Sequence, residues 1–172
     1  YLSATGRTHR LDWFLSTSPF VTEHAFRKSF HFENVSHAGY PRNDALFDPH
    51  DPMRLLNVDS RARELAMRHR ESAGKVGVYA PTFRNSLNDP FVDGTVDLKA
   101  LSDASSRLGL LLLVKLHPWM HGRLKSAELP GLVFVAPDSD LYPLLPLADF
   151  LITDYSSVFF DYLLLDRPVL FY

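Results

Sequence analysis

Apolar and polar blocks alternate along the second half of the chain in a way that is typical of strands and helices in turn. Unbroken apolar runs predict strands over residues 76–81, 110–116, 132–136 and 150–153, and one more that Pro168 opens. Amphipathic blocks between these runs predict helices over residues 60–72, 97–108, 140–148 and 158–166. Because buried parallel strands read as continuous apolar runs, this order predicts an α/β fold whose parallel sheet has helices on both faces.

The first part of the chain has a less regular pattern. It predicts a strand over 12–16, a helix over 19–32, a strand over 35–39 and a linker over 45–56. We therefore expect residues 1–48 to be the tail of one α/β domain with an interdomain turn. Residues 49–172 are expected to be most of a second α/β domain. We expect a fragment that is truncated at both ends.

The segment DFLITDYSSVFFDYLLLDRPVLFY (149–172) predicts a strand, a polar turn, a helix and a second strand. Its turn follows the carboxyl end of a strand, where open parallel sheets bind ligands. Ser156 and Ser157 stand where the helix begins, so backbone N–H groups, two hydroxyls and the helix dipole would converge there and suit a phosphate. The pattern leaves an alternative open, namely that Asp154 or Ser156 only caps the helix.

Three other polar motifs follow apolar strands: GYPRND (39–44), APTFR (80–84) and KLHP (115–118). The last two and the TDYSS turn (153–157) would share one edge of a parallel sheet and could surround one ligand. We therefore expect Asp154, Ser156 and Ser157 of this turn to bind the substrate. His117 could donate to a phosphate or transfer a proton, or could be a structural loop residue. Arg84 could pair with a phosphate through two hydrogen bonds, or could be a solvated surface side chain.

Asp161 lies one helical turn beyond Ser157, so it shares a helix face with the predicted phosphate site. Its carboxylate could accept hydrogen bonds from the two hydroxyls of a ribose. The alternative is a structural contact, either a salt bridge with Arg167 or a bond to the backbone.

Composition narrows the function classes. The 172 residues are 46% hydrophobic with a net charge of −2, so a core can form and nucleic acid is not expected as a partner. The chain contains no cysteine, no HExxH-type histidine spacing and no apolar run of the ~18 residues that a membrane span needs. We therefore expect no protein-bound metal and no cofactor, and an anionic ligand must be held by local groups.

Together, GYPRND, VYAPTFR, KLHP and ITDYSSVFFDYLLLDRPVLFY resemble the CDP-glycerol glycerophosphotransferase family of teichoic acid and capsule polymer enzymes. The resemblance implies a GT-B architecture of two Rossmann-like domains, with residues 1–48 in the N-terminal, acceptor-side domain. Residues 49–172 would be the C-terminal domain, which binds the nucleotide diphosphate and lacks its last helix. It implies that His117, Ser156 and Ser157 contact the pyrophosphate. The tail is also similar to nucleotide-sugar epimerases, in which an acidic residue at the place of Asp161 holds the ribose.

The resemblance implies transfer of glycerol phosphate, or a related polyol phosphate, from a CDP-activated donor to a polymer or lipid-linked acceptor. It implies a cytoplasmic location at the inner face of the membrane. Any contact with the membrane is expected to be peripheral and to involve parts outside these residues. The HGT-type motif that carries the family's base is not found, so we expect these residues alone to be inactive. Two alternatives remain: an enzyme that uses a UDP-sugar, and a non-catalytic nucleotide-binding module.

Overall fold

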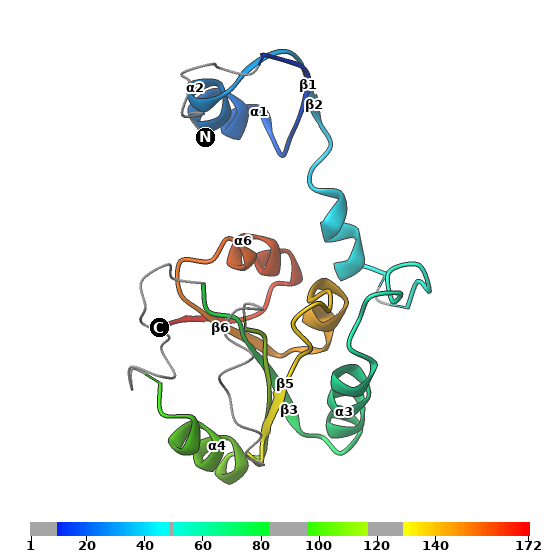
Figure 1. The fold of residues 1–172 in the computed structure, drawn as a ribbon, viewed down its shortest axis with the longest axis vertical. Coiled ribbons are helices and arrows are strands. Elements are labelled where there is room, and N and C mark those ends of the chain that lie inside the picture. Colours follow the sequence, from blue (N-terminus) through cyan, green and yellow to red (C-terminus); the bar gives the residue numbers. More distant parts are fainter. Residues whose placement is uncertain (1–9, 49, 83–95, 117–128) are drawn as a thin grey trace. The chain divides into compact units, whose positions relative to one another are not determined.

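The computed structural model describes residues 10–48, 50–82, 96–116 and 129–172, which are coloured in Figure 1. The chain divides into two compact units with a boundary between Asp44 and Ala45. The sequence predicts this boundary between residues 48 and 49, four residues closer to the C-terminus. The assignment of the two parts to an acceptor-side domain and a nucleotide-binding domain stays a prediction.

The first unit is built on two parallel strands, β1 (Arg10–Ser16) and β2 (His31–His37). A helical segment joins them and consists of α1 (Pro19–Val21), a π-helical turn η1 (Thr22–Phe26) and α2 (Arg27–Ser29). Its start has two ordinary helix signals, because the Ser18 hydroxyl accepts a hydrogen bond from Val21 N and Pro19 takes the first helical position.

The second half of this unit differs from the expectation. The predicted helix 19–32 ends at Ser29, and the second strand begins at His31 rather than at residue 35. Aromatic residues caused the error, since Phe26 and Phe30 recur at a helical spacing. In the structure Phe32 belongs to β2 and stacks on Phe14 of β1, with ring centroids 4.6 Å apart. Phe26 lies in the helical segment and Phe32 in the strand, so the series of aromatic residues does not mark where the helix ends.

The second unit contains a five-stranded parallel sheet. Its strands are β3 (Lys75–Tyr79), β4 (Leu110–Val114), β5 (Leu132–Phe134), β6 (Phe150–Thr153) and β7 (Val169–Phe171). Their order in the sheet is β5-β4-β3-β6-β7, and all neighbours are parallel. The chain runs outward from β3 to β5 and then returns to the other side of β3 at β6. The order therefore reverses between β3 and β6, where such sheets bind their ligands beyond the carboxyl ends.

Helices cover both faces of this sheet (Figure 1). On one face lie α3 (Ser60–Glu71), a 3₁₀ helix η3 (Tyr142–Leu147) and α6 (Val158–Tyr162), which a 3₁₀ turn η4 (Leu163–Leu165) continues. On the other face lies α4 (Leu98–Arg107). The expected α/β fold, a Rossmann-type parallel sheet between two helical layers, is confirmed. A further 3₁₀ helix, η2 (Pro41–Leu46), spans the boundary between the units.

Two predicted helices have a different form. The segment predicted as a helix over 140–148 is the 3₁₀ helix η3, because Pro146 lies inside it and has no backbone N–H to donate to an α-helical ladder. The helix predicted over 158–166 is α-helical only as far as Tyr162. It ends at Asp166, which adopts a left-handed conformation with φ of +52°.

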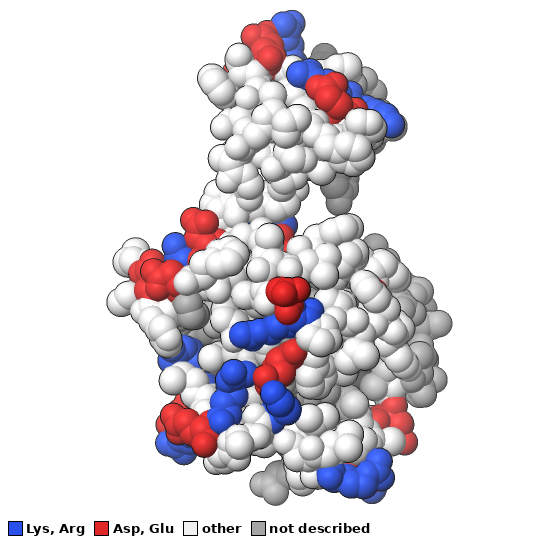
Figure 2. All heavy atoms as spheres, turned by 180° about the vertical axis from the view of Figure 1, so that it is seen from behind, with Lys and Arg blue, Asp and Glu red and all other residues white. Residues whose placement is uncertain are grey.

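Charges of both signs are mixed on the surface. Figure 2 shows one face on which basic and acidic side chains lie next to one another. Pairs of this kind include Arg68 with Glu64 and Arg70 with Asp149. This face has no broad positive field, so an anion bound on it must rely on nearby donors.

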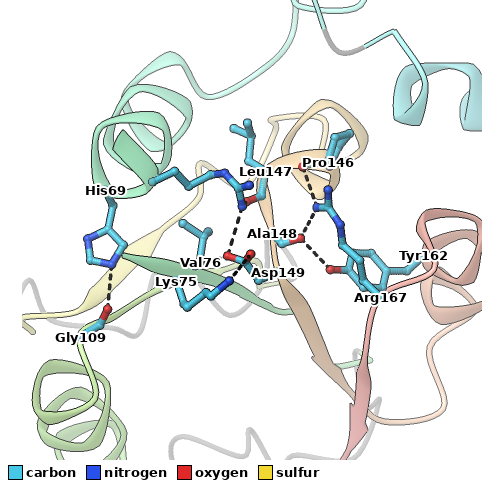
Figure 3. A network of polar contacts seen from close by, with 11 residues as sticks. His69, Lys75, Val76, Gly109, Pro146, Leu147, Ala148, Asp149, Tyr162 and Arg167 are labelled. Carbon is cyan, nitrogen blue, oxygen red and sulfur yellow. Dashed lines mark hydrogen bonds and ion pairs between the residues drawn. The ribbon is translucent and has the colours of Figure 1, made fainter. Parts of the chain in front are cut away.

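Polar side chains fasten the amino ends of β3 and β6 (Figure 3). The Asp149 carboxylate accepts a hydrogen bond from Val76 N at 2.9 Å and forms ion pairs with Lys75 and Arg70. Next to it, Tyr162 donates to Ala148 O at 2.9 Å, and burial raises the pKa of Tyr162 to about 12. This network lies at the edge of the sheet opposite to the carboxyl ends, so it serves the fold.

Candidate functional site

The carboxyl ends of β4, β3 and β6 lie side by side in the sheet, as the sequence motifs predicted. The segments that follow them are Lys115–Leu116, Ala80–Thr82 and Asp154–Ser157. Four of the predicted site residues, Asp154, Ser156, Ser157 and Asp161, are therefore near this edge or on the helix that leaves it. Arg84 and His117 lie outside the described residues, and their roles stay predictions.

Asp154 connects the two loops at the point where the strand order reverses. Its side chain is buried, with the residue 8% exposed. Its Oδ1 accepts hydrogen bonds from Thr82 N at 3.0 Å, from Thr82 Oγ1 at 2.5 Å and from Ser156 N at 3.2 Å. Beside it, Thr153 Oγ1 donates to Ala80 O at 2.6 Å. The loops that follow β3 and β6 are thus held together by side chains.

Ser157 occupies the N-cap position, directly before α6, but its side chain does not cap the helix. It has helical dihedral angles, and its hydroxyl makes no capping bond. Asp154 accepts from Ser156 N within the turn, so neither residue named in the capping alternative occupies the cap position. Among the residues that the structure describes, no hydrogen bond uses the N–H or the hydroxyl of Ser157 as a donor. The turn therefore has donors available for an anion.

Asp161 has a partner that the sequence did not indicate. It is 3% exposed, and the Tyr142 hydroxyl of η3 donates to its Oδ2 at 2.6 Å. The suggested salt bridge between Asp161 and Arg167 does not form. Instead, Arg167 donates to Pro146 O at 2.7 Å and also to Ala148 O. A phenol that holds one carboxylate oxygen fixes the orientation of the other.

Lys115 fastens the loop that follows β5. Its ammonium donates to three carbonyl oxygens, those of Ala136, Pro137 and Ser139, at 2.7, 3.0 and 2.6 Å. Burial lowers the pKa of Lys115, against the raising effect of nearby aspartates. Asp59 Oδ2 also accepts from Ala136 N at 2.8 Å. Lys115 therefore has a structural role next to the predicted catalytic His117.

Three residues of this edge were not identified from the sequence: Thr82, Lys115 and Tyr142. Thr82 and Lys115 stand inside the motifs APTFR and KLHP, so position alone could have marked them as candidates. No comparable signal existed for Tyr142, since its partner Asp161 comes from a different element. Within residues 10–48, 50–82, 96–116 and 129–172, no group of three or more His, Asp or Glu is placed to hold a metal ion.

None of the helices within the described ranges is long and apolar enough to cross a membrane.

Comparisons with known proteins agree with these motifs. The chain is 30% identical over its whole length to a teichoic acid ribitol-phosphate primase of Bacillus spizizenii, and covers 43% of that protein. Over 94% of its length it is 32% identical to a teichoic acid poly(glycerol phosphate) polymerase of the same organism, of which it covers 40%. The chain thus spans less than half the length of these curated relatives.

A solved structure gives the same result for the fold. The wall teichoic acid polymerase TagF matches with a TM-score of 0.71 and 30% sequence identity, over 93% of this chain and 38% of that one. The fold class is therefore that of TagF, which is GT-B-like. The family model for CDP-glycerol:poly(glycerophosphate) glycerophosphotransferase matches residues 3–172. Motifs, fold and comparisons together show that the chain belongs to this glycerophosphotransferase family.

Proposed function

We propose that the protein transfers glycerol phosphate, or a related polyol phosphate, from a CDP-activated donor to a hydroxyl of a teichoic-acid-type polymer or lipid-linked acceptor. The observation that carries the proposal is the position of the family's TDYSS turn. It follows β6 at the reversal of strand order, and its Ser157 donors have no partner among the described residues. A diphosphate needs donors of this kind at the carboxyl edge of a parallel sheet.

The reaction is a displacement at phosphorus. The acceptor hydroxyl oxygen attacks the β-phosphorus of the donor, and the bond from that phosphorus to the bridging oxygen breaks. CMP leaves with the bonding electrons, and the acceptor proton passes to a general base. The protein stabilises the charge on the phosphoryl oxygens and positions the two reactants.

Five of the six predicted site residues contact the donor in this proposal, all but Asp154. Ser156 and Ser157 belong to the turn that holds the diphosphate, and Asp161 accepts hydrogen bonds from the ribose. His117 and Arg84, which follow β4 and β3, neutralise the phosphoryl charge. The helix dipole contributes less than the sequence suggested, because α6 has only five residues. The hold on the phosphates must then come mainly from N–H groups and side chains.

The proposal assigns the nucleotide to the unit that begins at Ala45 and the acceptor to the domain that contains the first unit. Both a ribitol-phosphate primase and a glycerol-phosphate polymerase are among the relatives, so the proposal includes either polyol. A CDP-activated donor is a cytoplasmic metabolite. We therefore place the reaction in the cytoplasm, at the inner face of the membrane when the acceptor is lipid-linked.

A screen of donors tests the proposal. The protein at its natural length is incubated with a teichoic-acid-type acceptor and with CDP-glycerol, CDP-ribitol or a set of UDP-sugars, and the released nucleotides are separated. The proposal predicts CMP from at least one CDP donor and no turnover of the UDP-sugars. Turnover of a UDP-sugar without CMP from either CDP donor would support the epimerase-like alternative. Binding without turnover of any donor would support a non-catalytic module.

A further inference from the structure

The contacts of Asp154 differ from those of a residue that binds a diphosphate. Its Oδ1 accepts from Thr82 N, from Thr82 Oγ1 and from Ser156 N, and the residue is 8% exposed. These donors come from the two loops on either side of the reversal of strand order. One buried carboxylate therefore sets the relative position of two segments that lie 72 residues apart in the sequence.

The chemistry of carboxylates and phosphates also indicates that Asp154 does not bind the diphosphate directly. An ionised carboxylate has only acceptor atoms, and so have the oxygens of a diphosphate. The two cannot hydrogen-bond to one another, and their charges repel. A carboxylate in this turn is compatible with a bound diphosphate only when its charge is compensated by donors on the protein side. Thr82 and Ser156 are such donors, and the hydrogen bond from Thr82 Oγ1 is short at 2.5 Å.

The same bonds determine which donors of the turn remain for a ligand. Ser156 N is used by Asp154, whereas the N–H and hydroxyl of Ser157 have no partner among the described residues. If the carboxylate moved, the dihedral angles of the turn would change, and the direction of the Ser157 donors would change with them. The bond from Thr153 Oγ1 to Ala80 O fixes the two strands just before this point.

We propose that Thr82 is a positioning residue for the diphosphate site: through its two hydrogen bonds it holds the Asp154 carboxylate, and thereby the turn that presents Ser157. This inference rests on the proposed function, because it takes the ligand of the turn to be the diphosphate of the CDP donor. Thr82 itself does not contact the ligand in this account. Its loss should weaken recognition of the phosphates and leave recognition of the nucleoside intact.

Binding of two probes, CDP and cytidine, separates the phosphate part from the nucleoside part. Affinities are measured by calorimetry on the protein at its natural length and on the variants Thr82→Val, Thr82→Ala and Thr82→Ser. Thr82→Val is nearly isosteric and replaces the hydroxyl with a methyl group, while Thr82→Ala removes both the hydroxyl and the γ-methyl group. Ser102→Ala is the matched control, because it removes a buried hydroxyl that donates to Pro130 O at the opposite edge of the sheet.

We expect Thr82→Val and Thr82→Ala to weaken CDP binding about tenfold, because the turn no longer directs the Ser157 donors and about one hydrogen bond to the charged diphosphate is lost. Cytidine binding should stay within about twofold of the parent, which is within the scatter of such comparisons. Thr82→Ser keeps the hydroxyl and should restore CDP affinity. Ser102→Ala should lower the melting temperature without changing the affinity for either probe.

Two results would overturn the inference while the parent still binds CDP. One is unchanged CDP affinity in both hydroxyl-deletion variants. The other is an equal loss of CDP and cytidine affinity, which would indicate a general structural role for Thr82. Failure of Thr82→Ser to restore binding would also contradict it. A parent protein that binds neither probe would instead contradict the proposed function, and the inference with it.

Discussion

Replacing Asp149 with asparagine tests how the sheet is fastened at its amino edge. In the folded protein, partial burial on its own would raise the pKa of the Asp149 carboxyl. The hydrogen bond from Val76 N, together with the charges of Lys75 and Arg70, outweighs burial and holds that pKa below its ordinary value of 3.8. The ionised carboxylate is therefore bound more strongly in the folded state than in the unfolded state, and it stabilises the fold.

The magnitude follows from the contacts. In Asp149→Asn the amide side chain retains an acceptor oxygen for Val76 N, so the substitution exchanges a hydrogen bond to a charged group for a neutral one, at a cost of about 1 kcal/mol. The ion pairs with Arg70 and Lys75 are 3.2 and 3.3 Å long and lie partly in solvent. Exposed pairs contribute about 0–1 kcal/mol each. We therefore expect a loss of about 1–3 kcal/mol at pH 7.

Urea unfolding of the parent and the variant at several pH values measures this loss. Because the folded-state pKa is lowered, the stabilisation is fully present above the ordinary pKa of 3.8 and disappears as the pH falls through the lower folded-state pKa. The difference between parent and variant should be constant from pH 7 to about pH 5 and shrink below that. Glu64→Gln, which breaks the exposed pair with Arg68, is the control and should show no measurable loss. A difference of equal size at all pH values would refute the electrostatic reasoning.

Three further changes address the core and the site. Gly77→Ala should destabilise the protein by about 1–3 kcal/mol in thermal melting, because a Cβ there would lie 2.4 Å from Phe150 Cζ; an unchanged melting temperature would contradict this packing. Ser157→Pro, which deletes a backbone N–H, should weaken CDP binding more than Ser157→Ala, whose cost is about 0.5–1.5 kcal/mol; equal effects would remove the N–H from the site. His117→Ala should lower kcat about 10²–10³-fold with a smaller change in KM, and near-normal turnover would leave His117 a loop residue.

Local pattern was sufficient for much of the fold. The strand predicted over residues 150–153 has the observed bounds of β6, and the helix predicted over 60–72 differs from α3 by one residue at its end. Both segments have strong signals, an unbroken apolar run in one case and the Asp59 cap in the other. The helix predicted over 140–148 is instead a 3₁₀ helix over Tyr142–Leu147, because Pro146 inside it disfavours an α-helix.

The positions of the candidate site residues in the fold were predictable, but their contacts were not. Apolar runs that each end in a polar motif are sufficient to place Asp154 and Ser157 at one edge of a parallel sheet. The partners of Asp154 and Asp161 are Thr82 and Tyr142, which belong to other elements. No spacing rule relates residues so far apart in the sequence. For this reason the sequence identifies the aspartates but does not indicate which way their carboxylates face.

The central claim is that the diphosphate of a CDP-activated donor binds on the turn after β6, at the reversal of strand order. A crystal structure of the protein at its natural length with CDP-glycerol tests it most directly. We expect a phosphate oxygen of the donor within about 3 Å of the Ser157 N–H or hydroxyl, and the Asp161 carboxylate in contact with the ribose. A diphosphate bound away from this turn, with Ser157 in contact only with solvent, would contradict the account.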